Sequence, residues 1–282
     1  MFNKLILIFF LLTSPLVAQI KIATTIHPFK EIIQKVLGDR GKVISILKPG
    51  FSPHTYEISP SEIKEVESAD ALLFGADNLD GWVQKLANRR KIELIELLPK
   101  DSLLSVITIE GEVIGTDPHF WSDPLLVQIL LKKLEIELCK IDPDGCSEYE
   151  TNAGLFSDEL DRLFEKIKSE FSSLKKKTVI LSHPFFAYFL NRFNFTTAGL
   201  IEPIPGKEPT AKDLKKIIDT AIKEKVGAIF IHSQLPEKAA QIVSESTGIK
   251  TYTLDPIGGV RGRIIYEEIL LYNTEIIINA LK

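Results

Sequence analysis

Hydrophobic positions along this chain form two alternating patterns. Short runs rich in Val, Ile, Leu and Thr have the length of buried strands, and apolar residues recur every three or four positions in the longer segments between them. The runs that we predict to be strands are Lys21–Thr25, Val43–Leu47, Ala71–Phe74, Ile92–Ile95, Thr178–Ser182, Thr196–Leu200, Ala228–Ile231 and Thr251–Leu254. Strands that alternate with amphipathic helices are typical of α/β proteins with largely parallel sheets.

One helical pattern is longer than the others and separates the first four predicted strands from the last four. It extends from about Tyr149 to Lys175, which corresponds to a helix roughly 40 Å long. We therefore predict an α/β fold of two similar lobes joined by one long rigid helix. The expected boundaries are 19–148 for the N-terminal lobe, 149–176 for the linker helix and 177–282 for the C-terminal lobe. An ordinary surface helix within one lobe is the alternative.

The first 18 residues have the pattern of a cleaved signal peptide. Lys4 is followed by the apolar run Leu5–Leu12, and Leu16-Val17-Ala18 forms a cleavage site before Gln19. The apolar run is too short to cross a bilayer as a helix. We expect an exported protein, in the simplest case in a bacterial periplasm, and no lipid anchor because no cysteine adjoins the cleavage site.

Charge and cysteine content narrow the choice of partners and compartment. The formal net charge of −4 is spread over interspersed Lys and Glu, which argues against nucleic acid or an anionic membrane as a partner. The only two cysteines, Cys139 and Cys146, flank a short turn, and in an oxidising compartment we predict a disulfide between them. A metal-binding pair is the weaker alternative, because the CxxC spacing is absent.

Three histidines and one aspartate lie in short loops next to a proline. They are His54, His119, His183 and Asp255, with more than sixty residues between neighbours. Three imidazoles and one carboxylate complete the shell of a tetrahedral Zn²⁺ ion. Structural zinc clips use close pairs of ligands, so these distant ligands predict a site that the whole fold assembles. All four follow predicted strands, on the side where open α/β sheets bind ligands.

The segments around these residues resemble markers of a known family. Those segments are Pro53-His54-Thr55-Tyr56-Glu57, Asp117-Pro118-His119-Phe120-Trp121, Ser182-His183-Pro184-Phe185, Glu208-Pro209-Thr210 and Leu254-Asp255-Pro256-Ile257-Gly258-Gly259. In this order they resemble the metal-binding receptors of ABC importers for zinc and manganese, the ZnuA and TroA type. The resemblance implies two α/β lobes joined by a rigid helix, a metal bound between them, and delivery to an ABC importer permease at the inner membrane. It also implies a binding protein, not an enzyme, and we expect a monomer.

Four further features depart from or add to that resemblance. The segment Ser105–Thr116 contains no histidine, whereas several zinc-specific members have a His-rich acidic stretch there. His232 stands where many relatives have an acidic residue, and it has no assigned role. We expect Glu57 not to be a direct ligand but either to orient the imidazole of His54 or to stand at the entry of the next helix. His27 is more consistent with a hydrogen-bonded turn histidine than with a fifth ligand.

The donor set favours zinc among divalent metals. Three imidazole nitrogens and one carboxylate suit Zn²⁺, whereas Mn²⁺ prefers more oxygen ligands. In the family that the chain resembles, manganese usually accompanies a carboxylate at the position of His183. The hypothesis is high-affinity Zn²⁺ binding for import, with a Mn²⁺ or Fe²⁺ receptor as the alternative. A secreted zinc hydrolase is a less favoured alternative, because it would use three protein ligands and an open water position, and no HExxH motif is present. A metal-stabilised adhesin without transport is the remaining alternative function.

Overall fold

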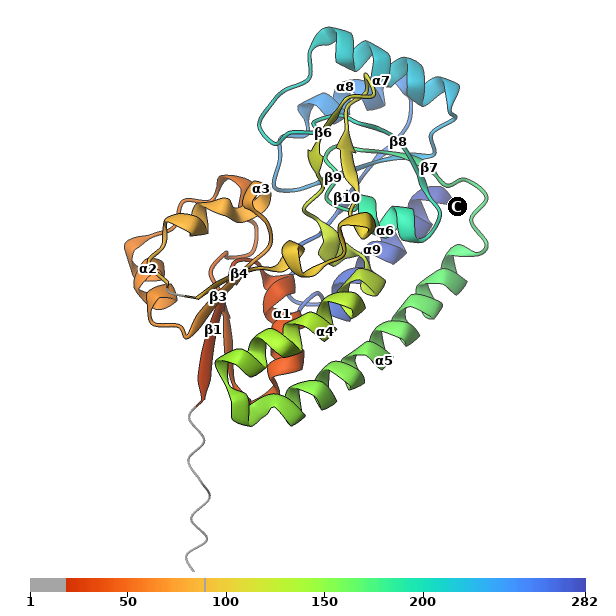
Figure 1. Cartoon of the computed structure of the whole chain (residues 1–282). Helices are drawn as coiled ribbons and strands as arrows, with labels where there is room; N and C mark the ends of the chain where they lie inside the picture. The colour runs from red at the N-terminus through yellow and green to blue at the C-terminus, as the bar shows by residue number, and fades with distance from the viewer. Residues whose placement is uncertain (1–18, 89) are drawn as a thin grey trace, which may run out of the picture.

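Two four-stranded parallel sheets form the frame of the molecule (Figure 1). The structure is a computed structural model that describes residues 19–88 and 90–282, so the predicted signal peptide lies outside the described residues. The strands of the first sheet are β1 (Ile20–Thr24), β2 (Gly41–Ser45), β3 (Ala71–Phe74) and β4 (Lys91–Glu93). Those of the second are β7 (Thr178–Leu181), β8 (Thr196–Leu200), β9 (Ala228–His232) and β10 (Thr251–Leu254). The predicted α/β fold with two lobes is confirmed.

The two sheets have the same topology. The first has the order β2-β1-β3-β4, and the second has the order β8-β7-β9-β10 when it is read in the same direction. In both, the first strand of the lobe is central and its successor lies at the edge. The similarity of the lobes is therefore a repeat of connections, although it has no clear counterpart in the residue sequence.

The predicted strands and the observed ones differ mainly at their ends. The run predicted at Val43–Leu47 is observed as β2, which begins two residues earlier. Hydrogen bonds nevertheless continue beyond β2, because the amides of Ile46 and Leu47 donate to carbonyls of Thr24 and Thr25. The apolar pattern therefore predicted the hydrogen-bonded segment correctly, although the regular strand ends two residues before the hydrophobic run does.

Helices cover the faces of each sheet. The first lobe has α1 (His27–Leu37), α2 (Pro60–Glu67) and the short α3 (Asp77–Asp80), and the second has α6 (Ala187–Arg192), α7 (Ala211–Lys223) and α8 (Lys238–Thr247). Capping boxes set the starts of α2 and α7: Ser59 pairs with Glu62, and Thr210 pairs with Asp213. None of the helices in the described part of the chain combines the length and apolar character needed to span a bilayer.

The long helix α5 (Cys146–Phe171) connects the two halves of the chain. It has 26 residues, and it starts three residues before the predicted start and ends four before the predicted end. It forms an antiparallel hairpin with α4 (Pro124–Ile141) (Figure 1). The disulfide Cys139–Cys146 closes the turn between them. The C-terminal helix α9 (Tyr266–Leu281) returns to pack on α5, and α1 packs on it as well. The connecting helix is thus part of a packed layer.

A β-hairpin that the sequence did not reveal precedes His119. Strands β5 (Ser105–Ile107) and β6 (Val113–Thr116) pair antiparallel, with Gly111 at φ 88° in the turn. Ile109 at its tip packs against the second lobe's hydrophobic cluster. A segment that follows the first sheet in sequence therefore lies against the second lobe.

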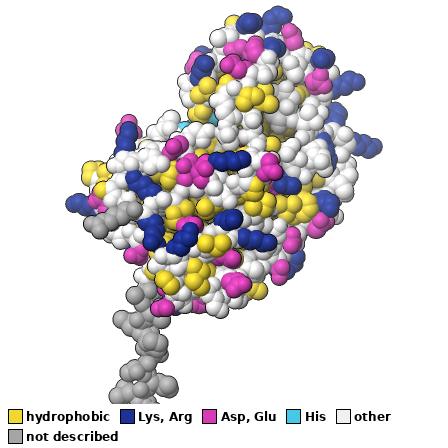
Figure 2. Space-filling view, viewed as in Figure 1, with side chains coloured by type: hydrophobic (Ala, Val, Ile, Leu, Met, Phe, Trp, Pro, Cys, Tyr) yellow, Lys and Arg dark blue, Asp and Glu magenta, His cyan; other side chains and the backbone are white. Residues whose placement is uncertain are grey.

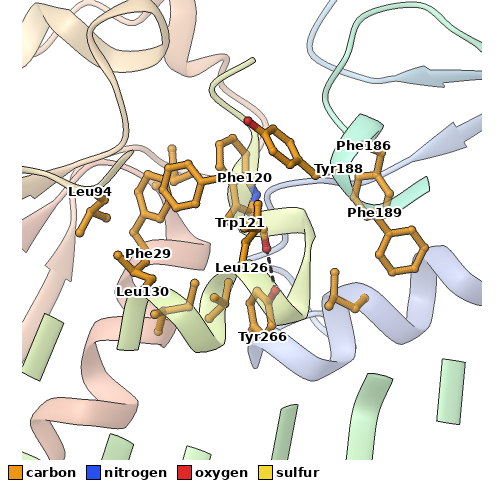
Figure 3. Close-up of a cluster of buried hydrophobic side chains, with 14 of the residues drawn as sticks. Phe29, Leu94, Phe120, Trp121, Leu126, Leu130, Phe186, Tyr188, Phe189 and Tyr266 are labelled. Carbon is orange, nitrogen blue, oxygen red and sulfur yellow. Dashed lines mark hydrogen bonds between the residues drawn. The ribbon is translucent and has the colours of Figure 1, made fainter. Parts of the chain in front are cut away.

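The two lobes share one hydrophobic core (Figure 3). Phe29 from α1 lies beside Trp121, with ring centroids 5.2 Å apart, and Phe189 from α6 belongs to the same cluster of buried residues. The hydroxyl of Tyr266 donates to the backbone carbonyl of Trp121 at 2.6 Å. This shared core fixes the position of the loop that follows His119.

Candidate metal centre

Three of the four predicted ligands come together between the lobes. The ligand atoms of His54, His119 and His183 all lie within 4.8 Å of one another. Ring centroids are 5.5 Å apart for His54 and His119, 5.2 Å for His54 and His183, and 5.0 Å for His119 and His183. The Nε2 atoms of His54 and His119 are 3.4 Å apart, which matches the separation of about 3.4 Å between two ligands of a tetrahedral Zn²⁺ ion.

Each imidazole is oriented by a hydrogen bond from its Nδ1 atom, the ring nitrogen that does not face the other histidines. The Nδ1 atoms of His54, His119 and His183 each lie within hydrogen-bond distance of an oxygen acceptor. The acceptors are, in the same order, Asn78 O at 3.1 Å, Asp117 Oδ1 at 2.7 Å and Glu202 O at 3.0 Å. Carbonyl and carboxylate oxygens only accept hydrogen bonds, so Nδ1 carries the proton and Nε2 is the metal-binding atom. The Nε2 of His183 is buried and has no hydrogen-bond partner.

Burial keeps two imidazoles of this cluster, those of His54 and His183, uncharged. Desolvation, with a further contribution from His119, lowers the pKa of His54 to about 3. The same causes place the pKa of His183 well below the ordinary histidine value. Since a metal binds only the unprotonated nitrogen, both side chains are ready to bind over the whole physiological pH range.

Asp255, the fourth predicted ligand, lies outside the cluster of three histidines. Its Oδ1 accepts hydrogen bonds from the backbone amides of Ile257 and Gly258, at 3.1 and 2.9 Å. Its Oδ2 lies 2.7 Å from Nε of Arg263. The residue directly follows β10, as predicted, but its carboxylate is directed to the loop that carries Arg263.

His232 is a neighbour of the cluster. It ends β9, where it pairs in register with Leu254, and therefore lies between the strands that precede Asp255 and His183. Its ring centroid is 6.0 Å from that of His183, its Nδ1 lies 2.7 Å from Oε1 of Gln234, and its Nε2 is buried without a partner. Burial lowers the pKa of His232 to about 4.

Two other expectations about polar residues have different outcomes. Nε2 of His27 lies 2.5 Å from the carbonyl oxygen of Ile264, so His27 is hydrogen-bonded as expected, but it is the first residue of α1 and not a turn residue, and it links this helix to the loop before α9. The expectation that Glu57 orients His54 was wrong. Glu57 is exposed, and the carbonyl of Asn78 accepts from His54 instead. A backbone acceptor leaves no mark in the sequence, whereas a nearby carboxylate does, which explains the error.

Both tryptophans support ligand loops, a role that the sequence did not suggest. The indole N–H of Trp82 donates to the carbonyl of Pro53, the residue before His54, at 3.0 Å. The indole N–H of Trp121 donates to the carbonyl of Pro256, the residue after Asp255, at 2.9 Å. Each loop is thus fixed by a large side chain from another segment of the chain.

A small pocket leads to the histidines from outside. It has a volume of about 250 Å³ and is lined by residues that include His54, Asn78, Thr116, His183 and Ile204. Histidine side chains are visible in the notch between the lobe that carries α2 and the lobe that carries α7 (Figure 2). The pocket wall includes β6 and the segment after β8, so the pocket lies beside the hairpin.

Two similar α/β lobes, with three imidazoles that converge between them, define a two-lobed metal-binding receptor. The sequence matches the family model "Zinc-uptake complex component A periplasmic" over residues 22–280, and the chain belongs to this family. It is a metal-binding substrate-binding protein of the ABC transporter type.

Individual relatives agree with that assignment. The chain is 26% identical over 271 residues to the manganese-binding lipoprotein MntA of Halalkalibacterium halodurans, covering 93% of this chain and 89% of MntA. It is 23% identical over 263 residues to the zinc-binding protein AdcA of Streptococcus pyogenes serotype M3, covering 86% of this chain and 51% of AdcA, so it spans about half the length of that relative. A crystal structure of ZnuA superposes with a TM-score of 0.81 at 27% identity, covering 94% of this chain and 100% of that chain.

Proposed function

We propose that this protein binds one divalent metal ion, with preference for Zn²⁺, in the periplasm and delivers it to the permease of an ABC importer. The observation that carries the proposal is the cluster of three Nε2 atoms, each on an imidazole whose Nδ1 proton is held by an oxygen acceptor. This arrangement brings three nitrogen donors close together, and the Nε2 atoms of His54 and His119 already have the separation expected of two ligands of one ion.

The donor set supports zinc over manganese. Nitrogen ligands favour the later first-row ions, and Mn²⁺ is at the weak end of that series. The relatives are named for both metals: MntA for manganese and AdcA for zinc. They therefore support a divalent metal as cargo without choosing between the two, and the choice of Zn²⁺ rests on His183 as the third nitrogen donor. A Mn²⁺ or Fe²⁺ receptor is the alternative.

In this proposal Asp255 is the fourth ligand. A carboxylate would complete a four-coordinate shell with His54, His119 and His183 and would leave no open position for a reactive water. A closed shell of this kind suits capture and transport, whereas a catalytic zinc needs an exchangeable water. The proposed role is thus a binding protein and not a hydrolase.

The decisive experiment is a competitive titration with Zn²⁺ and Mn²⁺. The protein without residues 1–18 is stripped of metal and compared with its His183→Ala variant and with a His27→Ala control, which removes an imidazole outside the cluster. We expect tight one-to-one Zn²⁺ binding that His183→Ala weakens by about 100-fold or more, because a direct ligand is lost. The control should bind within about threefold of the unmodified protein.

Two outcomes would contradict the proposal. Tighter binding of Mn²⁺ than of Zn²⁺ would retain a metal receptor and overturn the choice of cargo. Absence of tight binding for either ion, or equal losses in the two histidine variants, would contradict the metal site itself.

A further inference from the structure

The carboxylate of Asp255 offers only one of its oxygens to a cation. Oδ1 accepts from the amides of Ile257 and Gly258, and these two bonds fix the plane of the carboxylate. Oδ2 lies 2.7 Å from Nε of Arg263. An ion held by Asp255 and by the three histidines would therefore need the same oxygen that already faces a guanidinium.

Arg263 is held in place by its own loop. Its guanidinium carbon lies 4.2 Å from the ring centroid of Tyr272, its amide donates to Val260 O at 2.9 Å, and its carbonyl accepts from the amide of Gly259 at 2.8 Å. An arginine side chain stays protonated at any physiological pH. The loop thus places a permanent positive charge beside the one available oxygen of Asp255.

The contact between Arg263 and Asp255 is close but not optimally aligned. Nε is buried and makes no hydrogen bond of normal geometry, although it lies within ion-pair distance of Oδ2. A bidentate arginine–carboxylate pair would be stronger and harder to separate. The observed pair therefore neutralises Asp255 and can still be separated by a divalent cation.

We propose that Arg263 is an internal competitor of the cargo metal for Oδ2 of Asp255. The guanidinium occupies this oxygen when no ion is bound, and it withdraws when the ion takes the carboxylate as its fourth ligand. The competition lowers the affinity and speeds release, which a receptor that must hand over its cargo requires. This inference rests on the proposed function and assigns Arg263 a positioning role in it.

The test uses Arg263→Gln with Arg261→Gln as its matched control. Arg261 is an exposed residue of the same loop, so both variants remove one positive charge from it. Competitive titration and stopped-flow release of Zn²⁺ are measured for both. We expect Arg263→Gln to bind Zn²⁺ about tenfold more tightly and to release it more slowly, the scale of effect seen for residues that hold metal ligands. Arg261→Gln should stay within about twofold of the unmodified protein.

A double-mutant cycle with Asp255→Asn separates competition from a general charge effect. If Arg263 acts through Asp255, Arg263→Gln changes the affinity little in the Asp255→Asn background. Unchanged or weaker binding by Arg263→Gln, or an equal gain in both backgrounds, would overturn the inference. If Arg263→Gln does not fold, Arg263→Lys replaces it: a lysine cannot stack on Tyr272 as a planar group, so we expect a smaller gain, and weaker binding would overturn the inference. Failure of the proposed function is distinct, because the unmodified protein would then bind no metal tightly.

Discussion

At the scale of single residues, the metal centre depends on the histidines that would bind the ion and on the oxygen atoms that orient those histidines. The sequence predicts the first group more readily than the second. The histidines were predicted because each lies beside a proline after a strand. The acceptors that orient them were not predicted: Asn78 and Glu202 contribute backbone carbonyls, which any residue could provide. Only Asp117, two residues before His119, acts through its side chain. Sequence patterns therefore identify ligands more readily than the groups that orient them.

Buried neutral histidines should make the protein sensitive to acid. The pKa of His54 is lowered to about 3 and that of His232 to about 4, whereas both rise to about 6.5 on unfolding. The unfolded state then binds more protons below pH 6.5, so the stabilisation is present above that pH and is lost as the pH falls toward the folded values. We expect the protonation of each histidine in the unfolded state to lower the unfolding free energy by roughly 1.5 kcal/mol between pH 6.5 and pH 5.

Thermal unfolding of the metal-stripped protein, followed by circular dichroism between pH 7.5 and pH 4.5, measures this loss. Carboxylates also contribute to acid sensitivity, so the informative comparison is with a His54→Gln variant, whose amide does not titrate. The variant should lose less stability over the same range. Parallel pH curves for the two proteins would show that His54 is not buried in a neutral form.

At the scale of elements, the sequence predicted the long helix and the strands of the two parallel sheets well, and it missed the exposed strands β5 and β6. The amphipathic pattern of α5 continues to Leu174, but the helix ends at Phe171, where the hydroxyl of Ser172 donates to the carbonyl of Ser169 and competes with the helical hydrogen bonds. Strands β5 and β6 have three and four residues and are mostly exposed. Such short half-exposed strands leave no hydrophobic pattern, because their stability comes from contacts with the second lobe.

The turn between α4 and α5 provides a prediction at this scale. Replacing both Cys139 and Cys146 by serine should lower the unfolding free energy by about 2 kcal/mol, because the disulfide restricts a short loop of the unfolded chain. Zinc affinity should not change, since the disulfide shares no residue with the ligand loops. Urea unfolding and zinc titration of the double variant test both statements. Reduced zinc affinity at unchanged stability would contradict this division of roles.

At the scale of the whole molecule, the lobes are held together by side-chain contacts in addition to the connecting helix. Tyr188 of the second lobe donates to the carbonyl of Asp117, Tyr266 donates to Trp121, and Arg192 pairs with Asp123 at 2.8 Å. These contacts hold the His119 loop against the second lobe, and the shared core adds apolar contacts around them. Rotation of one lobe away from the other would break buried hydrogen bonds, which is unfavourable unless new partners replace them.

Metal binding should therefore change the shape of the protein very little. Small-angle X-ray scattering of the protein without residues 1–18, with and without one equivalent of Zn²⁺, should give radii of gyration that differ by less than about 1 Å. A sample with excess chelator controls for residual metal. A clear compaction on zinc binding would mean that the interlobe contacts separate in solution, and a hinge would then replace the rigid core as the description of this fold.

The attachment of the two indoles to two different ligand loops has a practical consequence. The chain contains only two tryptophans, and each reports on one loop: Trp82 on the loop of His54, and Trp121 on the loop of Asp255. Their fluorescence depends on the polarity and hydrogen bonding around the indole N–H. Variants that keep one tryptophan and replace the other by phenylalanine would therefore emit from one loop at a time. The order in which the two lobes respond to an arriving ion could be followed by rapid mixing, without any added dye.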